Sequence, residues 1–167
     1  MSRSIGEVAE SAVVLAIKQG LTVATAESLT AGLVAATLAD TPGASGMLQG
    51  GVVAYQNSVK SAVLGVPADL LDAVGSVDGG VAGAMADGAR RACGADVGVS
   101  TTGVAGPLAH DGKPVGTVYI GIATADGSVA YAYSFEGDRP GIRAQALSAA
   151  LERLLECLVQ ADLPHVK

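Results

Sequence analysis

Helical and extended patterns of apolar residues alternate along this chain, and that alternation constrains its fold more than any other feature. Apolar residues recur at helical spacing over residues 5–16, and Gly20 then supplies a helix stop. Short apolar stretches typical of strands follow at residues 21–25, 50–55 and 97–101. Helices that alternate with strands in this way are typical of an α/β fold.

Caps and stops mark the helices between these strands. Ser28 is placed to cap a helix that runs to about residue 39, and a shorter helix follows Asn57. Asp78 precedes an amphipathic helix that ends near Gly94. Each predicted strand is therefore separated from the next by at least one helix.

The last third of the sequence predicts a hairpin and a long helix. Residues 114–124 and 129–135 alternate like strands, and Asp126-Gly127 between them is typical of a hairpin turn. From about Arg139, a regular spacing of leucines indicates a helix with one buried stripe. We therefore predict a three-layer α/β/α sandwich around a mixed sheet.

Size and composition indicate one domain over residues 1–167. A chain of 167 residues falls within the usual size of a single domain and can bury about two thirds of its unfolded surface. Half of the residues are hydrophobic but only 3% are aromatic, so the core must consist mainly of Val, Leu, Ile and Ala. Such interiors suit layered α/β packing.

Charge and cysteine usage exclude several classes of function. A net charge of -6 with ten basic residues argues against binding to bare nucleic acid. No signal peptide or membrane-spanning stretch is evident, so we expect a cytoplasmic protein that does not bind a membrane. Cys93 and Cys157 are expected to be free buried thiols, and no zinc-ligand spacing is present, so no metal site is predicted.

Ser28 is the first candidate for chemistry, because it lies where a predicted strand meets a helix. Free backbone N–H groups gather at such a junction and can stabilise a negative oxygen that develops beside the serine. A serine at this position is more often a simple helix cap, and the residue alone does not decide between the two roles.

Tyr55 and Lys60 are the next candidates. A predicted strand ends at Tyr55, and the helical turn that follows contains Lys60. A hydroxyl nucleophile needs a base, and lysine can serve only if burial or nearby positive charge lowers its pKa by several units. The alternative is a solvated lysine on a helix face. His110 in a polar loop and His165 near the C-terminus are poorly placed for a Ser-His pair.

Two further segments suggest an anion site. The turn at residues 101–107 offers hydroxyls and exposed N–H groups, although it also fits an ordinary loop. Arg139 and Arg143 lie one helical turn apart at the start of the last helix, where arginine opposes the helix dipole. They are either solvated or paired with an anion such as a phosphate.

These segments, in this order, resemble the C-terminal domain of the CinA family and its stand-alone members, the PncC-like nicotinamide-nucleotide amidohydrolases. The resemblance covers nearly the whole chain, and the ordered set of motifs is specific although no single motif is. Its landmarks are Ala26-Glu27-Ser28, Pro42-Gly43-Ala44-Ser45, Gly50-Gly51-Val52-Val53-Ala54-Tyr55, Asn57 with Lys60, Leu64-Gly65-Val66, Thr102-Gly103-Val104-Ala105-Gly106-Pro107 and Lys113-Pro114-Val115-Gly116-Thr117-Val118.

The resemblance implies an amidohydrolase of pyridine nucleotide salvage that converts nicotinamide mononucleotide to nicotinic acid mononucleotide and ammonia. It implies Ser28 as nucleophile and Lys60 as general base, with Tyr55 and Thr102 orienting them, and no cofactor. It also suggests a homodimer or larger homo-oligomer.

For contacts with the substrate, a small pyridine nucleotide, our candidates are the side chains and turn glycines around these motifs: Glu27, Thr30, Gly103, Gly106, Arg139 and Arg143.

The chain departs from the family pattern beside the nucleophile. Leu29 and Ala31 stand where the family usually has Cys and Gly, and the loop at residues 108–112 also diverges. A domain that binds a nucleotide without hydrolysing it, for regulation or as a scaffold, is therefore a second hypothesis, and a structural oligomer is a third. The retained Ser28, Tyr55 and Lys60 favour the enzyme, because a pure binder needs no lysine beside a serine.

Overall fold

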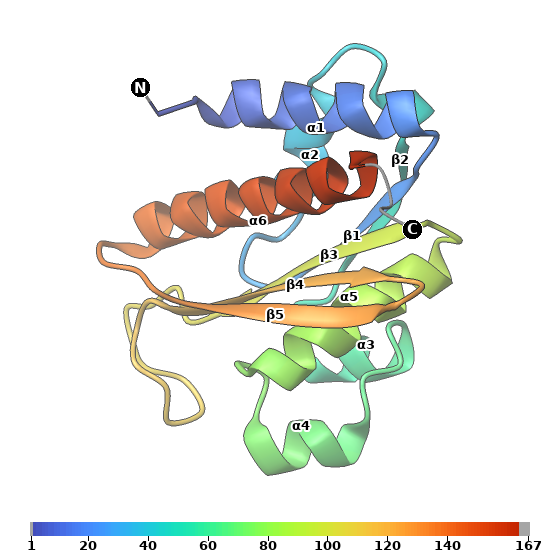
Figure 1. Ribbon diagram of the computed structural model, residues 1–167. Helices are drawn as coiled ribbons and strands as arrows, with labels where there is room; N and C mark the ends of the chain where they lie inside the picture. The colour runs from blue at the N-terminus through green and yellow to red at the C-terminus, as the bar shows by residue number, and fades with distance from the viewer. Residues whose placement is uncertain (1, 164–167) are drawn as a thin grey trace.

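The computed structural model describes residues 2–163 and has a mixed five-stranded sheet between two layers of helices (Figure 1). The strand order is β2-β1-β3-β4-β5, in which β1 is parallel to β2 and β3, whereas β4 and β5 are antiparallel. The three-layer sandwich predicted from the sequence is confirmed. The strands are β1 (Val23–Glu27), β2 (Leu48–Val53), β3 (Val97–Gly103), β4 (Thr117–Thr124) and β5 (Gly127–Ser134).

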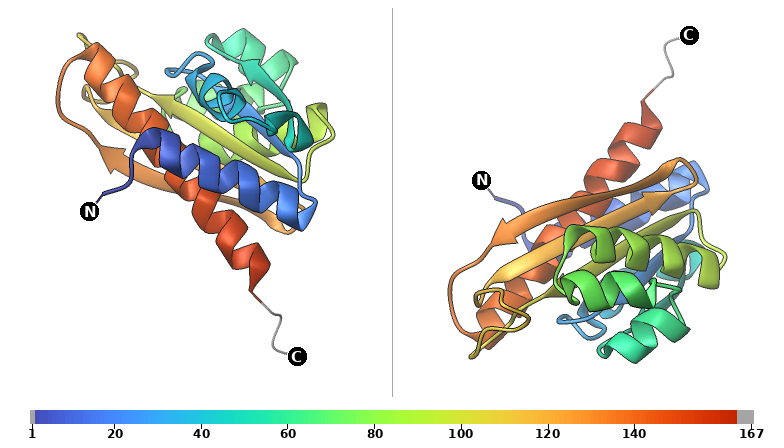
Figure 2. Two further views of the ribbon diagram at one scale, coloured as in Figure 1. Left: turned by 90° about the horizontal axis from the view of Figure 1, so that it is seen from above. Right: turned by 90° about the horizontal axis from the view of Figure 1, so that it is seen from below.

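Helices cover both faces of this sheet (Figures 1 and 2). One face carries α1 (Ile5–Gln19), α2 (Leu33–Ala39) and α6 (Arg139–Asp162), and α1 lies against α6. The other face carries α3 (Asn57–Ala62), α4 (Ala68–Val74) and α5 (Gly79–Ala92), and a 3-10 helix η1 (Ala44–Gly46) precedes β2.

Two hydrophobic cores result, one on each face of the sheet. Side chains alternate between the faces along a strand, so Val23 enters the core under α1 and α6 while Ala24 enters the core under α5. The leucine stripe predicted for the last helix is buried in the first core, where Leu151, Leu154 and Leu158 are each 0% exposed.

The parallel strands bring three chain segments to one edge of the sheet. In the register of the sheet, Glu27 at the end of β1 lies opposite Val53 of β2 and Thr101 of β3. The carboxyl ends of these strands therefore share an edge. Ser28, which follows β1, lies between the segment that leads to Lys60 and the turn that follows β3.

The helix predicted to begin at Ser28 begins at Leu33 instead, so the expected helix cap by Ser28 is wrong. Residues 28–32 form a turn, and Gly32 is the N-cap residue of α2. Ala31 has a φ of 49° and Gly32 a φ of 103°, both outside the helical region. A left-handed backbone at two consecutive positions ends any helix that would include them.

Strand boundaries also differ from the prediction. β1 starts at Val23 and extends to Glu27, and β2 ends at Val53, so Tyr55 lies beyond the strand that was predicted to contain it. β4 starts at Thr117 rather than at residue 114, because the backbone of Gly116 is left-handed (φ 94°) and turns the chain before the strand.

The left-handed backbone of Ala31 should lower the stability of the fold. A left-handed conformation costs an L-residue about 1–2 kcal/mol, and glycine avoids this cost but has more entropy to lose on folding. We expect Ala31→Gly to raise the free energy of unfolding by about 1 kcal/mol in urea denaturation. Ala36→Gly, at an exposed position inside α2, is the matched control and should lower it by about 1 kcal/mol. Loss of stability in both variants would contradict the strain.

Candidate active site

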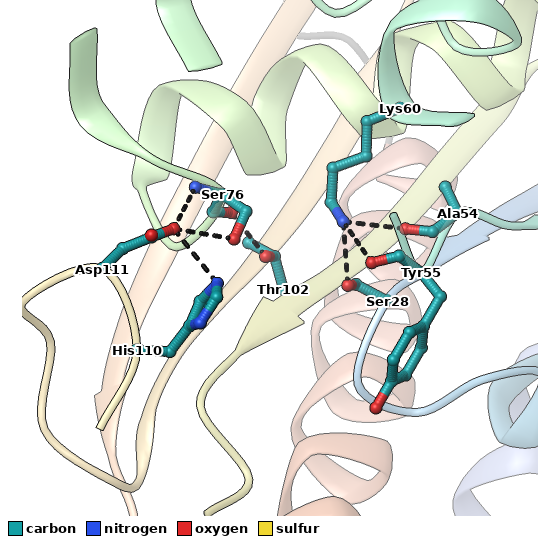
Figure 3. A network of polar contacts seen from close by, with 8 residues as sticks. All are labelled: Ser28, Ala54, Tyr55, Lys60, Ser76, Thr102, His110 and Asp111. Atoms are coloured by element: carbon teal, nitrogen blue, oxygen red, sulfur yellow. Dashed lines mark hydrogen bonds and ion pairs between the residues drawn. The ribbon is translucent and has the colours of Figure 1, made fainter. Parts of the chain in front are cut away.

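The hydroxyl of Ser28 faces the amine of Lys60, although the two residues lie 32 positions apart in the chain. The backbone of Ser28 is restrained, because its N–H donates to the carbonyl of Thr101 on β3 at 3.0 Å. Its Oγ lies 3.0 Å from Nζ of Lys60 (Figure 3). The structure thus brings together the serine and the lysine that the sequence singled out separately.

Lys60 is buried, with 1% of its surface exposed, and its amine has three oxygen neighbours. Besides Ser28 Oγ, Nζ contacts the carbonyl oxygens of Ala54 at 2.8 Å and Tyr55 at 3.1 Å (Figure 3). A charged amine donates to all three oxygens. A neutral amine has two N–H groups and one lone pair, so it donates to the two carbonyls and accepts from the hydroxyl of Ser28.

Burial lowers the pKa of Lys60 from 10.5 to about 8, and the negative charge of Asp111 opposes that shift. The amine is therefore neutral in a substantial fraction of molecules just above neutral pH. A solvated lysine on a helix face, the alternative reading of the sequence, does not fit this burial.

Tyr55 contributes its backbone rather than its phenol to this pair. Its carbonyl accepts from Lys60, while the ring points away from the amine (Figure 3). The phenol oxygen accepts from Nη2 of Arg139 at 2.7 Å. The structure thus places the main chain of Tyr55, and not its phenol, beside Lys60.

Thr102 was expected to orient Ser28 and Lys60, but its hydroxyl donates to the carbonyl of Ser76 at 2.6 Å. Among residues 2–163, no hydrogen bond joins this hydroxyl to either catalytic candidate. Its neighbour Thr101 lies closer to the nucleophile, since Thr101 Oγ1 is 3.3 Å from the N–H of Ser28. The alternation of a strand puts these two hydroxyls on opposite faces of the sheet.

The side chains of Glu27 and Thr30, expected to contact the substrate, are buried beneath the cleft and bonded to other parts of the chain. They are 1% and 0% exposed. The carboxylate of Glu27 accepts from the Thr30 hydroxyl (2.8 Å) and from the N–H groups of Val34 (2.7 Å) and Ala35 (3.1 Å). Glu27 therefore anchors the first turn of α2, and Thr30 links it to Thr101 through a contact of 2.7 Å between hydroxyls.

The two backbone N–H groups directly after Ser28 have no acceptor in the described part of the chain. They belong to Leu29 and Thr30, which are 4% and 0% exposed. Buried N–H groups are rarely left unpaired in folded proteins. Their position directly after a nucleophile suits the stabilisation of an oxyanion.

A cleft of about 580 Å³ opens beside Ser28. Both glycines predicted to contact substrate, Gly103 and Gly106, line it. A side chain at Gly103 would come within 2.8 Å of the carbonyl of Thr117, and Gly106 has a φ of 89°, so each position favours glycine. The volume falls in the range typical of small-molecule sites.

Arg139 and Arg143, which were predicted to bind one anion together, have different hydrogen-bond partners. Arg139 lines the cleft, where Nη1 donates to the carbonyl of Gly106 at 2.6 Å and Nη2 to Tyr55. Arg143 instead donates to the carbonyls of Leu29 (2.8 Å) and Thr30 (3.2 Å). Of the two, only Arg139 is among the residues that line the cleft.

Asp111, Ser76 and His110 also line the cleft. The sequence did not indicate Asp111 or Ser76, and it placed His110 in a polar loop without a partner. Asp111 Oδ2 accepts from the N–H (3.1 Å) and hydroxyl (3.2 Å) of Ser76 and lies 3.2 Å from Nε2 of His110 (Figure 3). The hydrogen bond from the Ser76 backbone holds the pKa of Asp111 below its usual value. These side chains come from two loops far apart in sequence, so no spacing pattern could reveal the cluster.

Outside this cleft, residues 2–163 contain fewer groups of side chains that suggest a catalytic or binding site. A second hollow of about 570 Å³ lies between α5 and the β4–β5 hairpin, but Asp87 there accepts hydrogen bonds from both Arg90 and Arg91. Cys93 and Cys157 are free as expected, although they are only partly buried. His165 lies outside the described residues.

In the same residues, no three His, Cys, Asp or Glu side chains gather as a group that could hold a metal ion. None of the helices within residues 2–163 is long and apolar enough to cross a membrane.

The titration of Lys60 can be measured directly, because the sequence contains only four lysines. With ¹³C-labelled lysine side chains, we expect one NMR signal with a midpoint near pH 8, absent in Lys60→Met. Asp111→Asn should lower this midpoint, since it removes the charge that raises the pKa of Lys60. Ser76→Ala is the control that loosens the same loop and keeps the charge. A wild-type midpoint above pH 10 would contradict the site.

The same shift predicts how stability depends on pH. Folding lowers the pKa of Lys60, so the unfolded chain binds more protons than the folded one between about pH 8 and 10.5. The wild type should therefore gain stability relative to Lys60→Met as the pH rises through this window, as measured by denaturant unfolding.

This chain is similar to known proteins of one family in both sequence and fold. The model of the CinA C-terminal domain matches residues 6–158. A competence-damage inducible protein of Desulforamulus reducens is 51% identical over 136 residues, which cover 81% of this chain and 33% of that protein. A CinA-like protein of Frankia casuarinae is 46% identical over 151 residues, which cover 90% of this chain and 34% of that protein. The chain thus spans about a third of the length of these curated relatives.

Solved structures agree with this assignment. The competence/damage inducible protein of Agrobacterium tumefaciens has a TM-score of 0.89 at 34% identity, covering 96% of this chain and 100% of that one. A CinA superfamily protein of Klebsiella pneumoniae has a TM-score of 0.90 at 30% identity, covering 95% and 99%. On its sequence and its fold, the chain belongs to the CinA C-terminal domain family.

Proposed function

We propose that this protein is a serine amidohydrolase that converts nicotinamide mononucleotide to nicotinic acid mononucleotide and ammonia. The observation that carries the proposal is the buried amine of Lys60, 3.0 Å from Ser28 Oγ and supported by two carbonyl oxygens. A domain that only binds a nucleotide has no need for a lysine that loses its proton near neutral pH.

Acylation begins when Ser28 Oγ attacks the amide carbon of the substrate. Neutral Lys60 takes the hydroxyl proton, and the N–H groups of Leu29 and Thr30 stabilise the oxygen that becomes negative. The C–N bond then breaks, and the ammonium group of Lys60 returns the proton to the departing nitrogen. Ammonia leaves, and the acyl group remains on Ser28.

Deacylation repeats these roles with water. Neutral Lys60 takes a proton from a water molecule as its oxygen attacks the acyl carbon, and the same backbone groups hold the oxyanion. The bond to Ser28 Oγ breaks, and the proton returns to that oxygen. The product is the carboxylic acid, and water is the second reactant in these steps.

Charges in the cleft support a pyridine nucleotide as the substrate. Nicotinamide mononucleotide carries a cationic ring and an anionic phosphate, and the cleft is lined by the anionic Asp111 and the cationic Arg139. Arg139 uses one N–H of each Nη in its contacts with Gly106 and Tyr55, which leaves three N–H groups for a phosphate. We assign Gly103 and Gly106 to the approach of the ribose and phosphate along this wall.

The reaction is tested by measuring ammonia release from nicotinamide mononucleotide. We expect Ser28→Ala and Lys60→Ala each to lower kcat by about 10³-fold or more, because both remove a group that reacts directly. Activity of the wild type should rise with pH through about 8, as Lys60 loses its proton. Lys113→Ala, which removes a lysine from the loop beside the cleft, is the matched control.

Two results would contradict this function. Release that persists in both variants would exclude the Ser-Lys mechanism. Binding of the nucleotide to the wild type without any release would favour a regulatory or scaffold domain.

Arg139 has its own test. Arg139→Gln should raise KM for nicotinamide mononucleotide by about 10-fold or more and change kcat less, because it removes a charge that binds the phosphate in ground and transition states alike. Nicotinamide riboside, which lacks the phosphate, should show little difference between the variant and the wild type. An equal loss on both substrates would contradict the assignment.

A further inference from the structure

Arg143 connects helix α6 to the turn that follows the nucleophile. Its Nε donates to the carbonyl of Leu29 at 2.8 Å and its Nη2 to the carbonyl of Thr30 at 3.2 Å. Both hydrogen bonds join α6 to the turn after β1, and their partners lie more than a hundred positions apart in the sequence. A charged donor makes a stronger hydrogen bond than a neutral one, so these contacts restrain two successive peptide groups.

That restraint fixes the direction of the neighbouring N–H groups. A trans peptide is planar, and its N–H points opposite to its carbonyl. With the Leu29 carbonyl held toward α6, the N–H of Thr30 points away from α6. The hydroxyl of Ser28 faces Nζ of Lys60. Lys60 belongs to α3, which lies on the face of the sheet opposite α6 (Figure 1).

The N–H of Thr30 lies in the interior without an acceptor in the described chain, whereas the next N–H, of Ala31, is bonded to the carbonyl of Ser28 at 3.1 Å. An unpaired buried N–H raises the free energy of a fold, so one that is kept beside a nucleophile points to a role in catalysis. Of the surrounding side chains, Arg143 makes the hydrogen bond that sets the orientation of this peptide.

We propose that Arg143 is a positioning residue that holds the Leu29–Thr30 peptide so that its N–H faces the oxyanion formed on Ser28. This inference rests on the proposed amide hydrolysis, and it replaces the expected contact of Arg143 with a phosphate. Arg143 acts through the main chain, so it strengthens binding of the transition state more than binding of the substrate. Its charge also polarises the peptide and makes the N–H a better donor.

The expected signature is a fall in kcat with an almost constant KM. Loss of one oxyanion donor typically lowers kcat by about 10²–10³-fold, and a loosened donor should cost less. We expect Arg143→Gln to lower kcat by about 10- to 100-fold and Arg143→Lys, which keeps the charge but not the fixed fork of donors, by less. KM should stay within about twofold in both. Arg153→Gln, on the same helix but far from the cleft, is the matched control.

A second measurement is independent of the substrate. A fluorophosphonate reacts with an activated serine and places a phosphoryl oxygen where the oxyanion would lie, so its rate of attachment to Ser28, followed by intact mass, reports on the same donors. Arg143→Gln should slow attachment by a factor similar to its loss of kcat. Ethylguanidinium added to Arg143→Ala should restore part of both rates, because it can donate again to the carbonyls of Leu29 and Thr30.

The outcomes separate the two proposals. A wild-type protein that is labelled at Ser28 but leaves nicotinamide mononucleotide intact would overturn the proposed substrate and leave the role of Arg143 testable by labelling rates. Labelling of the Arg143 variants at the wild-type rate would overturn the positioning role. A large rise in KM with unchanged kcat would overturn it too, in favour of contact with the phosphate.

Discussion

The buried amine of Lys60 is the constraint on which the rest of this site depends. An ammonium group is costly to remove from water, and a partnerless one would unfold the region or lose its proton. The segment after β2 meets this cost with the carbonyls of Ala54 and Tyr55, and the turn after β1 adds the hydroxyl of Ser28. These groups can meet because β1 and β2 are parallel neighbours whose carboxyl ends share one edge of the sheet. The order of the strands is therefore part of the chemistry of the site.

A series of hydrogen bonds between buried side chains supports the nucleophile. Glu27 accepts from Thr30, so the single hydroxyl proton of Thr30 is used, and Thr101 must donate in the contact between the two threonines. Thr101 is then free to accept from the N–H of Ser28. A carboxylate that also anchors the first turn of α2 thus fixes the turn that carries Ser28. The strain at Ala31 is tolerated because both ends of this turn are held.

Periodicity in the sequence was sufficient for the layers of the fold, because apolar spacing reports directly which face of a helix or strand is buried. It was sufficient for the pairing of Ser28 with Lys60 only when combined with family motifs, since the two meet across parallel strands. It failed where side chains serve the structure. Glu27 was expected at the substrate but anchors a helix, and the cluster of Asp111 with Ser76 depends on two loops whose approach is set by the whole fold.

A lysine base must satisfy two opposing requirements, and the surroundings of Lys60 address both. Full burial without a nearby charge would lower the pKa so far that the amine became a weak base, whereas exposure would keep it protonated at neutral pH. Here burial dominates, and the carboxylate of Asp111 partly offsets it, which leaves a pKa of about 8. Asp111 belongs to a loop that forms part of the wall of the cleft. The same loop therefore affects both the shape of the cleft and the basicity of the Lys60 amine. Divergence in this loop between relatives would then change reactivity as well as substrate fit, with Ser28 and Lys60 unchanged.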